Sequence, residues 1–195
     1  MIRRSPVRRS ARGGFEIRLK PDERALLSAL AGQLSPTLEA LRDPDATVPD
    51  VLRRLLPPAF STDASAEAAY VRLVREDLVE HHADALATLG ETASATHLDD
   101  AGLEAWLVAL NDLRLVLGTA LELTEEPVAP AEDDPQHGEW VCYQYLSYLA
   151  EEVVGALDAS LPPPRPGADD AAPEDPWGEP LGGLRWDGTP SPPQG

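Results

Sequence analysis

The sequence predicts an all-α fold, a compact bundle of about five helices preceded by a short N-terminal β-strand or extended segment. Three observations favour this class. Apolar residues recur at spacings of three and four along several stretches, which is typical of helices with one buried face. Prolines and glycines separate these stretches at short intervals. The chain has 195 residues, of which 43% are hydrophobic, and this is enough for one domain with a core.

The first element is expected at Phe15, Ile17 and Leu19, which alternate with charged residues in the period of two that marks a strand. A lone strand cannot form a sheet, so it either packs on the helices or pairs with a second copy of the chain in a homodimer.

Pro21 and the acidic residues after it then predict the start of a helix. Pro36 either ends this helix or restarts it.

The remaining helices are bounded by proline, glycine or acidic turn residues. They are expected over residues 51–56, 65–89, 99–123 and 138–157. Gly90 is expected to stop the second of these. The chain thus divides into a disordered basic arm (1–12), a helical domain (13–158) and a disordered tail (159–195). The tail is predicted to be disordered because ten prolines and six glycines follow residue 160. Its two tryptophans, Trp177 and Trp186, are interpreted as incidental rather than as a docking motif.

Charge is distributed unevenly. Residues 1–20 carry seven basic residues against Glu16 alone, whereas residues 21–158 carry seven arginines against 27 acidic residues. Such an acidic body repels phosphate, so a nucleic-acid partner is not expected.

Cys142 is the single cysteine and excludes an intrachain disulfide. No apolar run reaches the length of about 20 residues that spans a bilayer, so we expect a cytoplasmic protein without membrane contact.

Arg114 is the residue most in need of explanation. It falls within the apolar series of its helix, whose members are Leu103, Leu107, Leu110, Leu117 and Leu121. Burying a guanidinium is costly unless it is paired, so we expect a carboxylate beside it, and Glu152 of the last helix is the expected partner. The alternative is that Arg114 belongs to a recognition pocket for a carboxylate of a ligand or protein partner.

Two other features of these helices could form an interface. Asn111 and Gly118 are seven residues apart and share a helix face, where the glycine allows another helix to approach closely. The last helix carries a cluster of aromatic residues that wraps more than one of its sides; its members are Trp140, Tyr143, Tyr145 and Tyr148. Core packing and contact with another subunit explain this cluster equally well.

Signals for chemistry are weak. Asp77 and His81 could share a helix face, but the adjacent His82 points about 100° away, so a solvated face is preferred to a metal site. Cys142 and His137 are five residues apart and do not pair well on a helix, and a core cysteine is the expected role. No phosphate loop or nucleophile motif is present. We therefore expect no enzyme, no metal and no cofactor; a metal-dependent hydrolase around His81 is an alternative.

The run from Trp106 to Thr119, together with the segment from Phe15 to Leu19 leading into Pro21, resembles an uncharacterised actinobacterial family described as a domain of unknown function. The resemblance covers about residues 13–158, and its signature positions are Trp106, Asn111, Asp112, Arg114 and Gly118. Members of that family are typically encoded beside ClpS, the adaptor of the Clp protease, and some have been labelled transcriptional regulators. The resemblance implies a non-enzymatic interaction or accessory factor with a protein partner such as a Clp adaptor. A transcriptional regulator that uses the basic arm from Arg3 to Arg18 is the alternative.

Overall fold

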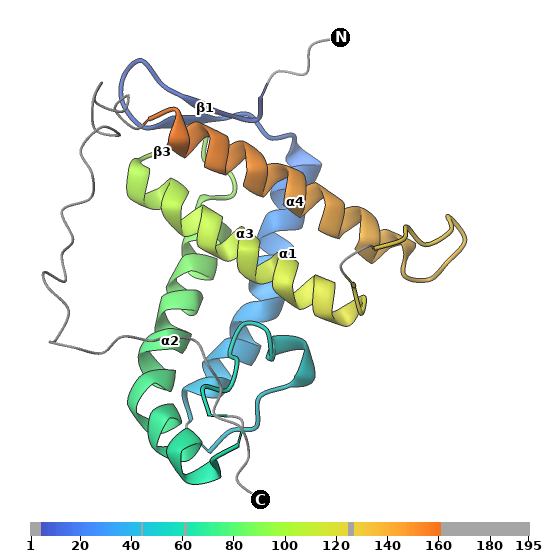
Figure 1. The fold of residues 1–195 in the computed structure, drawn as a ribbon. Helices are drawn as coiled ribbons and strands as arrows, with labels where there is room; N and C mark the ends of the chain where they lie inside the picture. The colour runs from blue at the N-terminus through green and yellow to red at the C-terminus, as the bar shows by residue number, and fades with distance from the viewer. Residues whose placement is uncertain (1–4, 44, 61, 125–126, 161–195) are drawn as a thin grey trace, which may run out of the picture. The chain divides into compact units, whose positions relative to one another are not determined.

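The computed structural model describes residues 5–43, 45–60, 62–124 and 127–160. Over these residues the chain forms four α-helices, three short β-strands and two 3₁₀ turns (Figure 1). In chain order they are β1 (Val7–Arg9), β2 (Phe15–Ile17), α1 (Pro21–Glu39), η1 (Ala40–Arg42), η2 (Asp50–Leu52), α2 (Ala64–Thr92), β3 (His97–Leu98), α3 (Asp100–Ala120) and α4 (His137–Asp158). The tail expected to be disordered falls outside the described residues from 161 onward, as do Trp177 and Trp186.

The predominantly helical class predicted from the sequence is confirmed, but the helix count is four rather than about five. The segment expected as a helix over 51–56 forms only the short 3₁₀ turn η2. Pro49 precedes this turn and Pro57 follows the segment, so too few residues lie between them for a stable α-helix.

Two helix ends also differ from expectation. Pro36 neither ends nor restarts the first helix, because α1 continues through it to Glu39. Gly90 does not stop α2, which runs on to Thr92. A Cβ atom at Gly90 would lie 3.6 Å from the Cβ atom of Ala31, so this glycine sits where α2 packs against α1. The residue serves helix packing here rather than helix termination.

The sheet is the main departure from the predicted architecture. The strand expected around Phe15 is the middle member of a three-stranded antiparallel sheet in the order β1-β2-β3. Its first neighbour, β1, lies in the arm expected to be disordered, so that expectation is wrong for the residues from Val7 to Arg9. The turn of the hairpin contains Gly13 and Gly14, whose φ angles of 92° and 64° favour glycine. Both neighbours of β2 come from the same chain, so the sheet needs no second copy.

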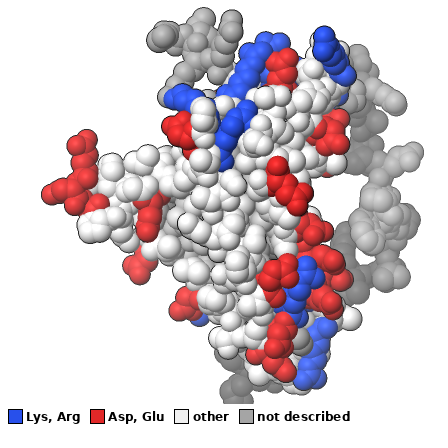
Figure 2. All heavy atoms as spheres, turned by 180° about the vertical axis from the view of Figure 1, so that it is seen from behind, with Lys and Arg blue, Asp and Glu red and all other residues white. Residues whose placement is uncertain are grey.

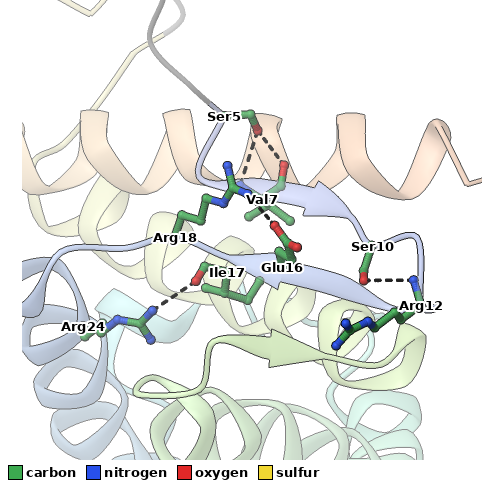
Figure 3. A network of polar contacts seen from close by, with 8 residues as sticks. All are labelled: Ser5, Val7, Ser10, Arg12, Glu16, Ile17, Arg18 and Arg24. Carbon is green, nitrogen blue, oxygen red and sulfur yellow. Dashed lines mark hydrogen bonds and ion pairs between the residues drawn. The ribbon is translucent and has the colours of Figure 1, made fainter.

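An arginine that the sequence analysis did not single out holds the sheet to the helices. The guanidinium of Arg24, in the first turns of α1, donates hydrogen bonds to four backbone carbonyls (Figure 3 draws the bond to Ile17). The acceptors are the carbonyl oxygens of Ile17, Leu19, Ala93 and Ala95, at 3.2, 3.1, 2.8 and 2.6 Å. Ile17 and Leu19 lie at the end of β2 and in the link to α1, whereas Ala93 and Ala95 lie in the link between α2 and β3. One side chain therefore joins the sheet, α1 and the end of α2.

The core lies between consecutive helices and under the sheet. Its largest fully buried side chains include Trp106, Phe15 and Ile17, each at most 2% exposed. The sheet contributes Phe15 and Ile17 to this core from one face, while its other face carries charged residues. Among the described helices, none has both the length and the hydropathy needed to cross a membrane.

Candidate functional site

Arg114 does not lie in the centre of the core. It is half-buried at the edge of the α3–α4 contact, where its Nε donates to Ser147 Oγ at 3.0 Å. Ser147 Oγ in turn donates to the backbone carbonyl of Tyr143 at 2.9 Å. The guanidinium carbon lies 6.0 Å from the centre of the Tyr143 ring, which is the range of a cation–π contact. A serine and an aromatic ring, rather than a carboxylate, therefore hold this arginine.

The expected pairing of Arg114 with Glu152 is wrong. Glu152 lies more than one helical turn beyond Ser147, toward the sheet, where its Oε2 accepts a hydrogen bond of 2.5 Å from Ser5 Oγ. That contact ties α4 to the segment before β1. Arg114 needs no buried carboxylate because it is only half-buried, and water can solvate the part of the guanidinium that the protein leaves open. Its two terminal nitrogens have no hydrogen-bond partner among the described residues.

Arg114 forms part of a continuous strip with two aromatic residues. The rings of Trp140 and Tyr143 stack with their centres 6.0 Å apart and an interplanar angle of 27°. Gly118 of α3 lies under Tyr143, because a Cβ atom at position 118 would be 3.5 Å from Tyr143 Cε2. The side chains of the strip, those of Arg114, Trp140 and Tyr143, are each half-buried. We call Arg114, Trp140 and Tyr143 the aromatic–arginine surface.

The other two members of the aromatic cluster of α4, which core packing and an interface explain equally well, lie elsewhere. Tyr145 and Tyr148 line a separate hollow of about 210 Å³ together with Lys20 and Glu23 at the start of α1. The hydroxyl of Tyr145 is buried there without a hydrogen-bond partner among the described residues. Burial, reinforced by Glu23, raises the pKa of this phenol. The four aromatics of α4 therefore separate into two groups on different sides of the helix.

The other signature residues have contrasting environments. Trp106 is fully buried, and its indole N–H donates to Thr92 Oγ1 at 2.8 Å, so it is a core residue that joins α3 to α2. Asn111 is exposed, whereas Gly118 is buried, so these two do not share one contact face as predicted.

Asp112, rather than Arg114, is the buried charged side chain of α3. It is 1% exposed, and its Oδ2 lies 2.8 Å from His82 Nδ1 of α2. No other charged side chain among the described residues is buried to this degree. Burial raises the pKa of Asp112, and the hydrogen bond and charge of His82 oppose that rise only in part. The pair is a polar tie between α2 and α3.

The residues weighed for metal or thiol chemistry are not brought together. His82 faces Asp112 and does not lie on a solvated face. His81 is exposed, and its ring meets the His82 ring edge-on, with the two ring centres 5.5 Å apart. Among the described residues, no group of three or more His, Cys, Asp or Glu side chains is placed to hold a metal ion. Burial, with a smaller contribution from Glu139, raises the pKa of the half-buried Cys142 thiol, which disfavours the reactive thiolate.

A family model described as a domain of unknown function (DUF2017) matches residues 4–157 of the chain. The chain belongs to the DUF2017 family. The match includes the hairpin, all four described helices up to residue 157, and every residue of the aromatic–arginine surface. The sequence resemblance to an actinobacterial family of unknown function is thereby confirmed at the level of the family.

Two curated relatives of this DUF2017 protein come from mycobacteria, which are actinobacteria. The putative oxidative stress regulator AosR of Mycobacterium leprae (strain TN) is 35% identical over 130 residues, which cover 64% of this chain and 59% of that protein. The chain thus spans about three fifths of that relative's length. The oxidative stress regulator AosR of Mycobacterium tuberculosis (strain ATCC 25618 / H37Rv) is 28% identical over 184 residues, covering 75% of this chain and 83% of that protein. No solved structure matches the chain significantly.

Proposed function

We propose that this DUF2017 protein is a non-enzymatic regulator that acts by binding another protein through the aromatic–arginine surface. The names of the mycobacterial relatives, oxidative stress regulators, support a regulatory role. The observation that carries the proposed binding mode is the strip of Trp140, Tyr143 and Arg114 along α3 and α4. Its rings stack, and the outer nitrogens of its guanidinium have no hydrogen-bond partner within the described part of the chain.

Tryptophan, tyrosine and arginine are the residue types most enriched at the energetic centres of protein interfaces. Here the three are already held in place, because Ser147 accepts a hydrogen bond from Arg114, the Tyr143 ring packs beside Gly118 of α3, and Trp140 stacks on Tyr143. A preordered surface loses little side-chain entropy when a partner binds. The outer nitrogens of Arg114 suit a carboxylate or carbonyl of that partner, and the ring faces suit apolar side chains.

The Clp adaptor ClpS is the first named partner to test, since the family resemblance implies its genomic neighbourhood. We expect the full-length protein to bind purified ClpS in a calorimetric titration, and Arg114→Ala to weaken binding by about tenfold or more, the typical loss at an interface hot spot. Arg72→Ala, at an exposed arginine of α2, is the matched control and is expected to bind normally. Absence of binding by the folded wild-type protein would rule out ClpS as the partner.

The regulatory role itself is tested by complementation under oxidative stress. In an actinobacterial host that lacks its own member of the family, the wild-type chain is expected to restore growth in hydrogen peroxide. Arg114→Ala and Trp140→Ala, expressed at equal levels, are expected not to restore it, whereas Arg72→Ala is. Equal rescue by all four chains would show that the aromatic–arginine surface is not the functional site.

A further inference from the structure

The outward face of the sheet carries a group of cations on a protein whose body is acidic. The strand register places Arg8 of β1 beside Glu16 of β2, and Glu16 beside His97 of β3. Arg18, directly after β2, has its Nη2 2.6 Å from Glu16 Oε2, and Arg12 lies in the hairpin turn (Figure 3). We call Arg8, Arg12 and Arg18 the sheet arginines.

The sheet arginines have more positive charge than their surroundings neutralise. Arg8 and Arg12 are exposed, and neither guanidinium forms an ion pair with any described residue. Arg18 has one partner, Glu16, in an exposed pair. The neighbouring Arg9 differs, because it pairs with Asp100 at 3.0 Å. Among the described residues, Glu16 is therefore the one carboxylate that pairs with a sheet arginine, while Glu151 and Glu152 line a separate hollow with Arg8.

The same face is hollowed. An open depression of about 810 Å³ lies beside the hairpin turn, and its lining includes Arg12, Arg18 and His97 together with the carboxylate of Glu16. Arg8 lies outside this lining, on the strand that pairs with β2. Ser10 and Thr96 add hydroxyl groups to the same lining. Guanidinium and hydroxyl groups are hydrogen-bond donors suited to carboxylate oxygens.

We propose that the sheet arginines form a docking site for an acidic peptide segment of a partner protein. Figure 2 shows Lys and Arg side chains gathered at the end of the domain that carries the sheet, with some acidic side chains among them, while further Lys and Arg side chains lie among acidic ones at the opposite end. Charge complementarity therefore favours an acidic occupant at this end. The donors of the depression come from the hairpin turn, from the segment after β2 and from the start of β3.

A short acidic peptide fits this site better than a nucleic-acid duplex. Duplex DNA carries one negative charge per about 1.7 Å along its axis and continues past any contact point. It would bring phosphates against a body in which residues 21–158 contain 27 acidic residues and seven arginines. A peptide can end within the basic region, and repulsion from more distant acids is screened over about 8 Å at physiological ionic strength.

The experiment measures binding to the full-length protein by fluorescence anisotropy. The probes are a labelled ten-residue peptide of alternating Asp and Ser, a matching peptide of alternating Lys and Ser, and a labelled 20-base-pair DNA duplex. We expect the acidic peptide to bind, with an affinity that falls as salt is added, and the basic peptide and duplex to bind at least tenfold more weakly.

Two kinds of substitution, with opposite expected effects on peptide affinity, make the test specific. Arg8 and Arg12 are the sheet arginines that form no ion pair with a described residue, and replacing both (Arg8→Ala with Arg12→Ala) is expected to weaken peptide binding by about tenfold. Glu16→Gln is expected to strengthen it by about two- to fivefold, since it removes the carboxylate that competes for Arg18. Arg72→Ala and Glu76→Gln, at exposed positions of α2, are the matched controls and should leave binding unchanged.

This site is independent of the aromatic–arginine surface, so Arg114→Ala should bind the acidic peptide normally even if the proposed regulatory function fails. Preference for the duplex over the acidic peptide would overturn the proposal in favour of nucleic-acid binding through the basic hairpin. Peptide affinity that is insensitive to Arg8, Arg12 and Glu16 in folded variants, as judged by circular dichroism, would overturn it as well.

Discussion

His82 Nδ1 and Asp112 Oδ2 lie 2.8 Å apart and join the middle of α2 to the middle of α3 inside the domain. The side chains are 12% and 2% exposed, so water has little access to either group. Removing one partner of such a pair leaves a buried polar group without a hydrogen bond, which lowers the free energy of unfolding. The pair makes the packing of α2 on α3 sensitive to the protonation state of one carboxyl group.

Asp112→Asn is expected to change how stability depends on pH. Because burial raises the pKa of Asp112 above its ordinary value of 3.8, the folded state holds this proton more tightly than the unfolded chain does. The contribution of Asp112 to the free energy of unfolding is therefore greatest at low pH and is lost as the pH rises through the folded pKa. Asparagine has no such titration.

Urea unfolding of both proteins at a series of pH values from about 4 upward measures this difference. The free energy of unfolding of the variant should rise relative to that of the wild type across the window between the ordinary and the raised pKa. A constant difference between the two proteins over that window would contradict the assignment.

Arg24→Leu is expected to destabilise the domain by about 1.5–3 kcal/mol, the range for hydrogen bonds to a charged group, because four carbonyl oxygens lose their donor. Arg53→Leu is the control, since the Arg53 side chain makes one exposed ion pair, with Asp50, among the described residues, and its effect should stay within about 0.5 kcal/mol. Urea denaturation measures both. Equal losses in the two variants would show that Arg24 does not hold the sheet.

Gly118→Ala is expected to stabilise the domain by about 0.5–1 kcal/mol, because alanine is the better residue inside a helix. The added methyl group would lie 3.5 Å from Tyr143 Cε2 and 3.7 Å from Leu123 Cδ1, which are ordinary contact distances. Gly118→Val adds bulk beyond that limit and should displace the Tyr143 ring. Thermal melts compare the variants; a lower melting temperature for Gly118→Ala would mean that the ring packs more tightly than the structure indicates.

The helices could be predicted because they depend on local spacing. Leu103 and Leu110 are fully buried as expected, but the centre of the buried stripe of α3 runs through Trp106 and Leu113. The observed stripe is turned about the helix axis from the predicted one by about half of the 100° that separates successive residues. Because both stripes are rich in leucine, the sequence pattern does not distinguish them. That small rotation moves Arg114 to the edge of the contact. Asp112 is buried for another reason, because α2 packs on a different side of α3 from α4 and places His82 against it.

The contacts that sequence reasoning missed are long-range. His82 with Asp112, Ser5 with Glu152 and Arg24 with the loop after α2 join residues 30 or more positions apart, and no local pattern reports them. The strand β1 was missed because two of its three residues are arginines. An edge strand can accept them, since their side chains remain in water while the backbone pairs with β2.

The most direct test of the central claim is photo-crosslinking from the aromatic–arginine surface in living cells. A photoreactive benzophenone amino acid replaces the exposed Gln144, one helical turn after Trp140, and in the control it replaces the exposed Glu76 of α2. We expect a discrete crosslinked protein, identified by mass spectrometry, from position 144 and not from position 76, and we expect Arg114→Ala to abolish it. Absence of a product from position 144, or a product that persists in Arg114→Ala, would contradict binding of a protein partner at this surface.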